Sequence, residues 1–164
     1  MPFGLYNAPA TFQRTMDFVL QDLREFCNAY FDDILVDTDT VEDHVVALLE
    51  LYKRLEKEKF FANPEKCVFA QPEVEFCGFI LGKDGIRPHP KKLMSIHVWP
   101  TLKNPTDVKS FLGLCGFYQR FVSDYATVAA PLTDLMKKDR EWSWGENENC
   151  AFQELKIRFL KHQC

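Results

Sequence analysis

Two adjacent aspartates stand out because an apolar or aromatic run lies on each side of them. Cys27–Tyr30 precedes Phe31, Asp32 and Asp33, and Ile34–Val36 follows. This order is typical of a strand, a tight turn and a second strand, so it predicts a hairpin that carries both carboxylates at its tip. Two neighbouring carboxylates repel each other as anions, and a divalent cation that binds both removes the repulsion. The pair therefore indicates either a metal site or an ordinary solvated turn.

The segments around this hairpin are expected to form helices and a second hairpin. Residues 11–23 carry apolar side chains at helical spacing. Thr40 is a candidate N-cap for a helix that ends near Lys59. The apolar stripe of that helix consists of Val45, Leu48, Leu49, Tyr52 and Leu55. Val74–Leu81 has the composition of a strand, and the turn at residues 82–85 leads into Ile86.

Beyond Pro88 and Pro90 the pattern becomes helical, which places a boundary near Arg87. Helices are expected over residues 91–99, 106–125, 129–136 and 147–161. In the long second helix Asn104 can cap the N-terminus, because Pro105 suits the first helical position. Its inward-facing residues are expected to be Phe111, Leu112, Cys115, Tyr118 and Val122.

The net charge of −4 is divided unevenly along the 164 residues. Residues 87–138 carry 8 Lys/Arg against 3 Asp/Glu, whereas residues 1–86 carry 8 against 16. A basic block beside an acidic block is typical of a phosphate-contacting element next to a metal-binding element, although chance surface charge gives the same counts.

The cysteines and the hydropathy pattern exclude several classes of protein. Six cysteines occur without a C-x-x-C pair, so we expect free thiols, neither disulfides nor zinc. No apolar run is long enough for a membrane span, and the N-terminus does not resemble a signal peptide. We therefore expect an intracellular protein without a membrane partner, in the cytoplasm or the nucleus.

A set of short blocks, taken in order, resembles the reverse transcriptases of gypsy-type LTR retrotransposon Pol polyproteins. The two leading blocks are residues 2–13, which read PFGLYNAPATFQ, and residues 30–36, which read YFDDILV. The similarity continues through His44, NPEKC at 63–67 and FCGF at 76–79. It then runs through FLGL at 111–114, FYQRF at 117–121, APL at 130–132, Trp144 and AFQELK at 151–156.

The resemblance implies an α+β fold, a partial polymerase palm of antiparallel hairpins with packed helices, followed by a helical thumb. It assigns residues 1–87 to the C-terminal part of the palm, 88–138 to the thumb, and 139–164 to the start of a connection or RNase H-like region. Some positions depart from the family pattern: Phe31 replaces an aliphatic residue, Asp37 a serine and Cys77 a leucine.

The resemblance also implies roles for individual residues. Asp32 and Asp33 would be the catalytic, metal-binding pair for Mg²⁺, with Mn²⁺ as an alternative. Two ions about 3.5–4 Å apart would serve nucleotidyl transfer. Phe3 and Gly4 would contact the incoming nucleotide, and Lys66 would act as a general acid. The template and primer would contact Pro9, Gln13, Phe76, Gly78, Phe79, Lys109, Ser110, Gly113 and Phe117.

Each of these roles has an ordinary structural alternative, namely a turn, a helix start, a buried hairpin or a surface charge. The family's first catalytic aspartate precedes the block at residues 2–4, and so do most of the fingers. We therefore expect that this chain alone has no polymerase activity. A longer parent protein would bind an RNA/DNA template–primer duplex and dNTPs.

Two non-catalytic hypotheses remain open. In one, the chain is a nucleic-acid-binding remnant whose binding depends strongly on salt. In the other, it is a structural remnant that self-associates through an exposed edge of the palm sheet.

Overall fold

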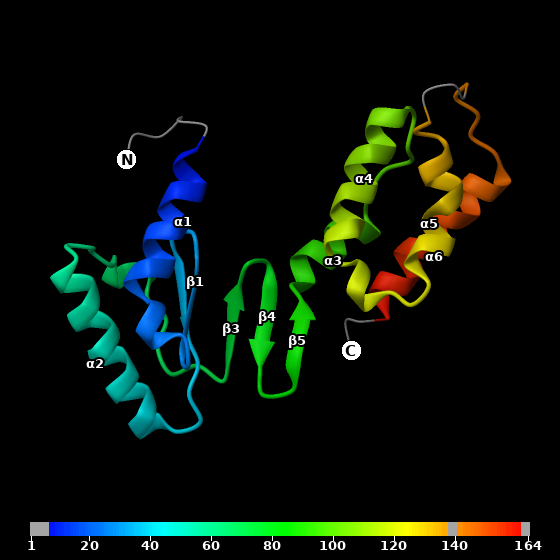
Figure 1. Cartoon of the computed structure of the whole chain (residues 1–164). Coiled ribbons are helices and arrows are strands. Elements are labelled where there is room, and N and C mark those ends of the chain that lie inside the picture. Colours follow the sequence, from blue (N-terminus) through cyan, green and yellow to red (C-terminus); the bar gives the residue numbers. More distant parts are fainter. Residues whose placement is uncertain (1–6, 138–140, 162–164) are drawn as a thin grey trace. The chain divides into compact units, whose positions relative to one another are not determined.

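The computed structural model describes residues 7–137 and 141–161, and these residues separate into two compact units. Unit 1 comprises residues up to Cys77 together with Leu81–Gly85, and unit 2 comprises Gly78–Ile80 and the residues from Ile86 onward. The described part is a mixture of helices and small antiparallel sheets (Figure 1), as the α+β prediction requires. None of the described helices is long and apolar enough to cross a bilayer.

Unit 1 packs two helices against a two-stranded hairpin. Helix α1 is Ala8–Val19, and the 3₁₀ turn η1 at Gln21–Leu23 follows it. Strands β1 (Cys27–Tyr30) and β2 (Asp33–Val36) pair antiparallel. Helix α2 (Val41–Lys57) is the second helix of the unit, and the backbone N–H of Asp43 donates to the capping hydroxyl of Thr40. The buried core consists of Met16, Val19, Leu20, Leu23, Cys27, Leu51 and Leu55.

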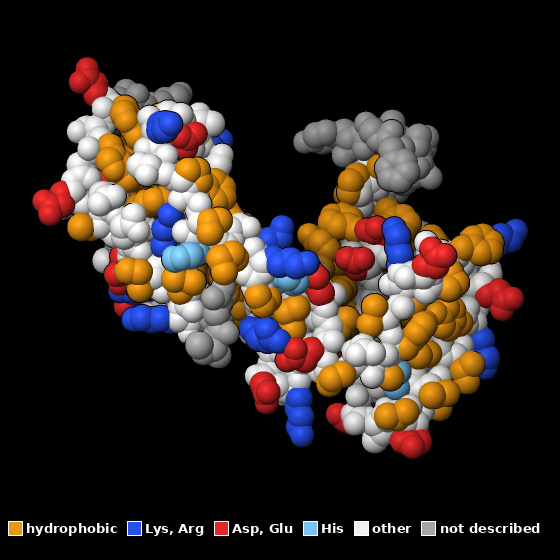
Figure 2. All heavy atoms as spheres, turned by 180° about the vertical axis from the view of Figure 1, so that it is seen from behind, with side chains coloured by type: hydrophobic (Ala, Val, Ile, Leu, Met, Phe, Trp, Pro, Cys, Tyr) orange, Lys and Arg blue, Asp and Glu red, His pale blue; other side chains and the backbone are white. Residues whose placement is uncertain are grey.

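The buried face of α2 differs from the apolar stripe that the sequence suggests. Ala47, Leu51 and Leu55 are buried at i, i+4 and i+8, whereas Val45 and Leu49 are more than half exposed. Hydrophobic side chains accordingly appear at the surface of the molecule (Figure 2). The helix is apolar over an arc wider than one face, so periodicity alone did not decide which side packs inward.

Three short strands follow unit 1's helices where the sequence suggests one long strand and a turn. They are β3 (Glu73–Phe76), β4 (Phe79–Gly82) and β5 (Gly85–Pro88). The three strands form one sheet in the order β3-β4-β5. The 3₁₀ turn η2 at Pro64–Lys66 precedes them in the chain. A single continuous strand over 74–81 is therefore wrong, whereas the predicted turn that leads into Ile86 is confirmed between β4 and β5. Cys77 and Gly78 both have positive φ, +51° and +80°, which breaks the strand into a hairpin.

Unit 2 is a helical bundle. Its helices are α3 (Pro90–His97), α4 (Pro105–Phe117), α5 (Tyr125–Asp134) and α6 (Glu146–Leu160), with the 3₁₀ turn η3 at Gln119–Phe121. All five residues predicted to face inward from α4 and the segment after it are buried. Helix α6 shares this core through Phe152, Leu155 and Phe159, so residues 146–160 pack with the other helices of unit 2.

Helix α4 ends at Phe117, eight residues before the predicted end. The backbone of Tyr118 leaves helical values at φ −103° and ψ 11°, and Asp124 takes a left-handed conformation before α5. The predicted N-cap is confirmed, because the side-chain oxygen of Asn104 accepts from the backbone N–H of Asp107 at 2.9 Å.

Candidate polymerase site and duplex-binding face

The β1–β2 hairpin turns in only two residues. Tyr30 pairs with Asp33, which leaves Phe31 and Asp32 as the turn. Phe31 has a φ of +53°, whereas Asp32 is not among the residues with positive φ. A positive φ at the first turn position alone is typical of a type II′ turn, which normally uses glycine there. A side chain in this conformation costs about 1–3 kcal/mol, which contacts elsewhere must offset.

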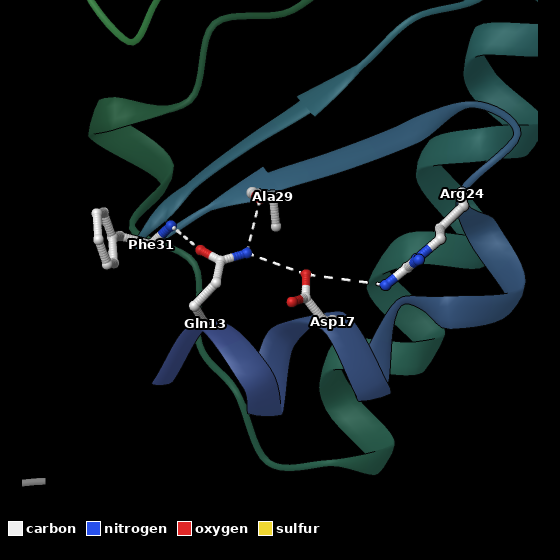
Figure 3. Close-up of polar contacts among 5 residues, drawn as sticks. All are labelled: Gln13, Asp17, Arg24, Ala29 and Phe31. Atoms are coloured by element: carbon white, nitrogen blue, oxygen red, sulfur yellow. Dashed lines mark hydrogen bonds and ion pairs between the residues drawn. The ribbon is translucent and has the colours of Figure 1, made fainter. Parts of the chain in front are cut away.

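The side-chain amide of Gln13 supplies such contacts (Figure 3). Its oxygen accepts from the backbone N–H of Phe31 at 2.6 Å, and its nitrogen donates to the backbone carbonyl of Ala29 at 3.0 Å. The same nitrogen donates to Asp17 at 3.0 Å. Helix α1 thus holds the hairpin tip through one side chain. A template contact by Gln13 stays a prediction. In this structure its amide binds the hairpin.

Arg24 extends this network but adds little free energy. Its guanidinium lies 4.0 Å from the carboxylate of Asp17 (Figure 3), and both side chains are largely exposed. Exposed ion pairs of this kind contribute about 0–1 kcal/mol. The neutral hydrogen bonds of Gln13 therefore matter more for the geometry of the turn.

Asp32 and Asp33 are both exposed at this tip. Within residues 7–137 and 141–161, no group of three or more His, Cys, Asp or Glu side chains is arranged to hold a metal ion. Carboxylate oxygens are the ligands that hard divalent cations prefer, so the pair has the right chemistry for part of such a site.

The turn between β3 and β4 is close enough to Asp33 to sense its charge. Burial raises the pKa of the Cys77 thiol, and the negative charge of Asp33 raises it further. Both residues belong to unit 1. The hairpin with the two aspartates and the end of β3 at Phe76, which is half-buried, therefore belong to the same unit.

The remaining predicted thumb residues lie on one exposed side of α4. Lys109, Ser110, Gly113 and Phe117 are all exposed, at spacings of three and four residues that bring them onto one face. A Cβ added to Gly113 would meet no atom within 4 Å. The ring of Phe79 stacks on that of Phe117, with centroids 5.1 Å apart and planes 21° apart. We call Lys109, Ser110, Gly113 and Phe117 the α4 face.

The other predicted residues are more scattered. Pro9 is exposed in the first turn of α1, and Lys66 is exposed at the end of η2. Phe3 and Gly4 lie outside the described residues.

Two structural roles escaped the reading of the sequence. They are the bonds of Gln13 to the turn and the bond of the Tyr118 hydroxyl to the carbonyl of Gly78, at 2.9 Å. For Tyr118 a signal existed, because a tyrosine predicted to face inward needs a partner for its hydroxyl.

A palm-type hairpin with paired carboxylates, followed by a helical bundle, defines the chain as a segment of polymerase type. Residues 1–81 match the family described as reverse transcriptase (RNA-dependent DNA polymerase). The chain belongs to this family.

The similar proteins include Pol polyproteins of retrotransposons. The retrovirus-related Pol polyprotein from transposon 297 of Drosophila melanogaster is 35% identical over 163 residues, which is 98% of this chain and 15% of the relative. The one from transposon opus of the same species is 40% identical over 138 residues, or 84% of this chain and 14% of the relative. This chain thus corresponds to a short segment of those proteins.

Solved structures confirm the fold. A foamy viral protease–reverse transcriptase in complex with double-stranded DNA matches 96% of this chain and 28% of that chain, with a TM-score of 0.87 and 24% identity. The same viral protein in complex with an RNA/DNA hybrid matches 98% of this chain and 22% of that chain, with a TM-score of 0.85 and 24% identity.

Proposed function

We propose that this chain supplies part of the active site of an RNA-directed DNA polymerase, which performs template-directed nucleotidyl transfer in a longer Pol polyprotein. The observation that carries the proposal is the pair Asp32–Asp33 on a strained two-residue turn that Gln13 holds in place. A strained turn persists only where its surroundings hold it, and such turns cluster at functional sites.

A divalent cation, with Mg²⁺ proposed in particular, suits this pair in part. Asp32 and Asp33 offer exposed carboxylate oxygens, and the third ligand residue would come from outside the described residues. When bound, such ions would activate the primer 3′-hydroxyl and stabilise the leaving pyrophosphate. The contribution of this chain is to hold both carboxylates still, because a rigid turn lowers the cost of ordering the site.

Other residues have proposed roles around the carboxylates. Phe3 and Gly4 would contact the sugar of the incoming nucleotide. Lys66, exposed on η2, would donate a proton to the leaving pyrophosphate, as a cation near a phosphate can. Pro9 would lie on the template side.

Unit 2 is proposed to bind the template–primer duplex through the α4 face. The solved structures of the foamy viral protein contain double-stranded DNA in one case and an RNA/DNA hybrid in the other. In this chain, Lys109 offers a positive charge to a phosphate, and Gly113 leaves room for close approach of a backbone. The exposed ring of Phe117 offers a flat apolar surface for a sugar.

Primer extension tests the catalytic proposal. An extended protein that adds the upstream palm and fingers would be assayed with Mg²⁺ on an RNA template, as wild type, as Asp32→Asn and as Asp39→Asn. Asp39 is a matched control because it is an exposed acid outside the turn. We expect Asp32→Asn to lower the incorporation rate by roughly a thousandfold or more, since it removes a charged metal ligand, and Asp39→Asn to have little effect.

Two outcomes would contradict parts of the catalytic proposal. If Asp32→Asn retains activity, the carboxylate is not a ligand. If the extended wild type is inactive, the nucleic-acid-binding hypothesis replaces the catalytic one. The α4 face favours that second candidate, because all four of its residues are present and exposed in this chain. It predicts duplex binding that weakens steeply with salt, without incorporation.

A further inference from the structure

The hydroxyl of Tyr118 forms a bond between two parts of unit 2 that are distant in the sequence. Tyr118 is 1% exposed, and its hydroxyl donates to the backbone carbonyl of Gly78 at 2.9 Å. A buried tyrosine usually satisfies its hydroxyl with one partner. Here the partner is a turn rather than a neighbouring helix, so the bond ties the β3–β4 turn to the end of α4.

Gly78 is adapted to this close approach. Its φ of +80° follows a φ of +51° at Cys77, as in a two-residue type I′ turn. A Cβ added at Gly78 would lie 3.1 Å from the Tyr118 hydroxyl, which is too tight for ordinary packing. The carbonyl of Gly78 also accepts from the backbone N–H of His89 at 3.2 Å, so it is held from two sides.

The next residue, Phe79, connects this turn to the α4 face. Its ring stacks on that of Phe117 and meets the ring of Tyr118 edge-on, with centroids 5.4 Å apart and planes 71° apart. Phe117 itself is 53% exposed. The Tyr118–Gly78 hydrogen bond and the stacking of Phe79 on Phe117 therefore both connect the turn to the end of α4.

We propose that Tyr118 is a positioning residue that fixes Gly78 and Phe79 against α4, so that the turn and the α4 face present one surface to the 3′ end of a primer. This proposal rests on the duplex binding proposed above and adds a specific role. Tyr118 is buried, so it touches no nucleic acid itself and acts through the turn.

The test compares Tyr118→Phe with Tyr125→Phe in this chain. Tyr125 is a matched control, because it is a second phenol of unit 2, whose hydroxyl lies 3.5 Å from the carbonyl of Leu112. The first measurement is amide hydrogen exchange of residues 76–82 without nucleic acid. The second is the ratio of two affinities, for an RNA/DNA hybrid with a recessed DNA 3′ end and for a blunt hybrid of equal length.

We expect Tyr118→Phe to speed exchange in residues 76–82 by about five- to tenfold, since one hydrogen bond to the turn is lost. We also expect it to lower the preference for the recessed end, while Tyr125→Phe changes neither quantity. Unchanged exchange overturns the anchoring role. Faster exchange with equal weakening on both hybrids overturns the positioning role.

The two hybrid affinities distinguish a failure of this proposal from a failure of the proposed duplex binding. This proposal fails alone if the wild type binds both hybrids equally well, or if the wild type prefers the recessed end and Tyr118→Phe retains that preference. If the wild type binds neither hybrid, the proposed duplex binding fails and the positioning role falls with it, whatever the exchange of the turn.

Discussion

At the scale of single residues, Gln13 bonds to both sides of Tyr30 in the turn that carries the aspartates. We expect Gln13→Ala to destabilise unit 1 by about 1–3 kcal/mol, because it leaves the Phe31 amide and the Ala29 carbonyl without their partner. Chemical denaturation and exchange of the Phe31 amide measure the effect. Arg14→Ala is the control, since that neighbouring side chain donates to the Ala10 carbonyl of its own helix. An equal loss in both variants would contradict the role of Gln13.

Cys115 makes unit 2 sensitive to alkali. Burial raises the pKa of its thiol from 9.0 to about 12. As the pH rises, the thiol therefore loses its proton at a lower pH in the unfolded chain than in the folded one. The stability that this group contributes is fully present below about pH 9, and it falls as the pH rises toward the pKa of the folded state. At about pH 10.5 the loss from this group is about 2 kcal/mol.

Chemical denaturation at neutral and alkaline pH checks this prediction. Cys115→Ala should show a smaller fall between the two pH values than the wild type does. Cys150→Ala is the control, because that thiol is exposed, and it should behave as the wild type. The prediction fails if Cys115→Ala and the wild type lose the same stability. Tyr125, with its pKa raised to about 12 chiefly by burial, adds a fall of the same sign in all three proteins.

At the scale of elements, Gly113 lowers the stability of helix α4 but keeps the α4 face free of a side chain at that position. Gly113→Ala should stabilise the helix by about 0.5–1 kcal/mol, because no atom within 4 Å opposes a methyl group. The same methyl would weaken duplex binding by roughly tenfold if a backbone approaches there. Gly116→Ala is the control, since its Cβ would point toward Tyr125. Melting curves and duplex titrations measure both effects, and unchanged binding would exclude Gly113 from the interface.

Substitution of a leucine by lysine on either face of α2 tests which face of the helix is buried. Leu49 is 56% exposed and Leu51 is 5% exposed. We expect Leu49→Lys to change stability by less than about 0.5 kcal/mol, and Leu51→Lys to cost several kcal/mol, roughly 4 or more, because it buries a charge. Thermal denaturation of both variants decides the point. The reverse order would mean that α2 packs through its other face.

At the scale of the whole molecule, each unit has its own buried cluster. We expect Leu51→Ala to cost about 2–5 kcal/mol and to speed hydrogen exchange in unit 1 alone. Leu132→Ala, which truncates a fully buried side chain of unit 2, should speed exchange there alone. Exchange read by mass spectrometry separates the two. Faster exchange throughout the chain in either variant would show that the units unfold together.

The sequence by itself determined the kind of protein and the local elements. The order of its motifs indicated a reverse transcriptase, and the runs beside Asp32 and Asp33 predicted the hairpin that the structure contains. The caps at Thr40 and Asn104 marked two helix starts correctly. These signals are local, since turns, caps and strand alternation depend on neighbours in the chain.

Only the tertiary structure decided which face of α2 is buried, where β3 ends and where α4 ends. It also showed that Gln13 bonds to the Phe31 turn and that Tyr118 bonds to Gly78. These two hydrogen bonds join residues far apart in the sequence, 18 residues apart for Gln13 and Phe31 and 40 for Tyr118 and Gly78. Local patterns cannot predict such contacts, because the packing of the whole chain determines which group lies within hydrogen-bonding distance of a hydroxyl or an amide.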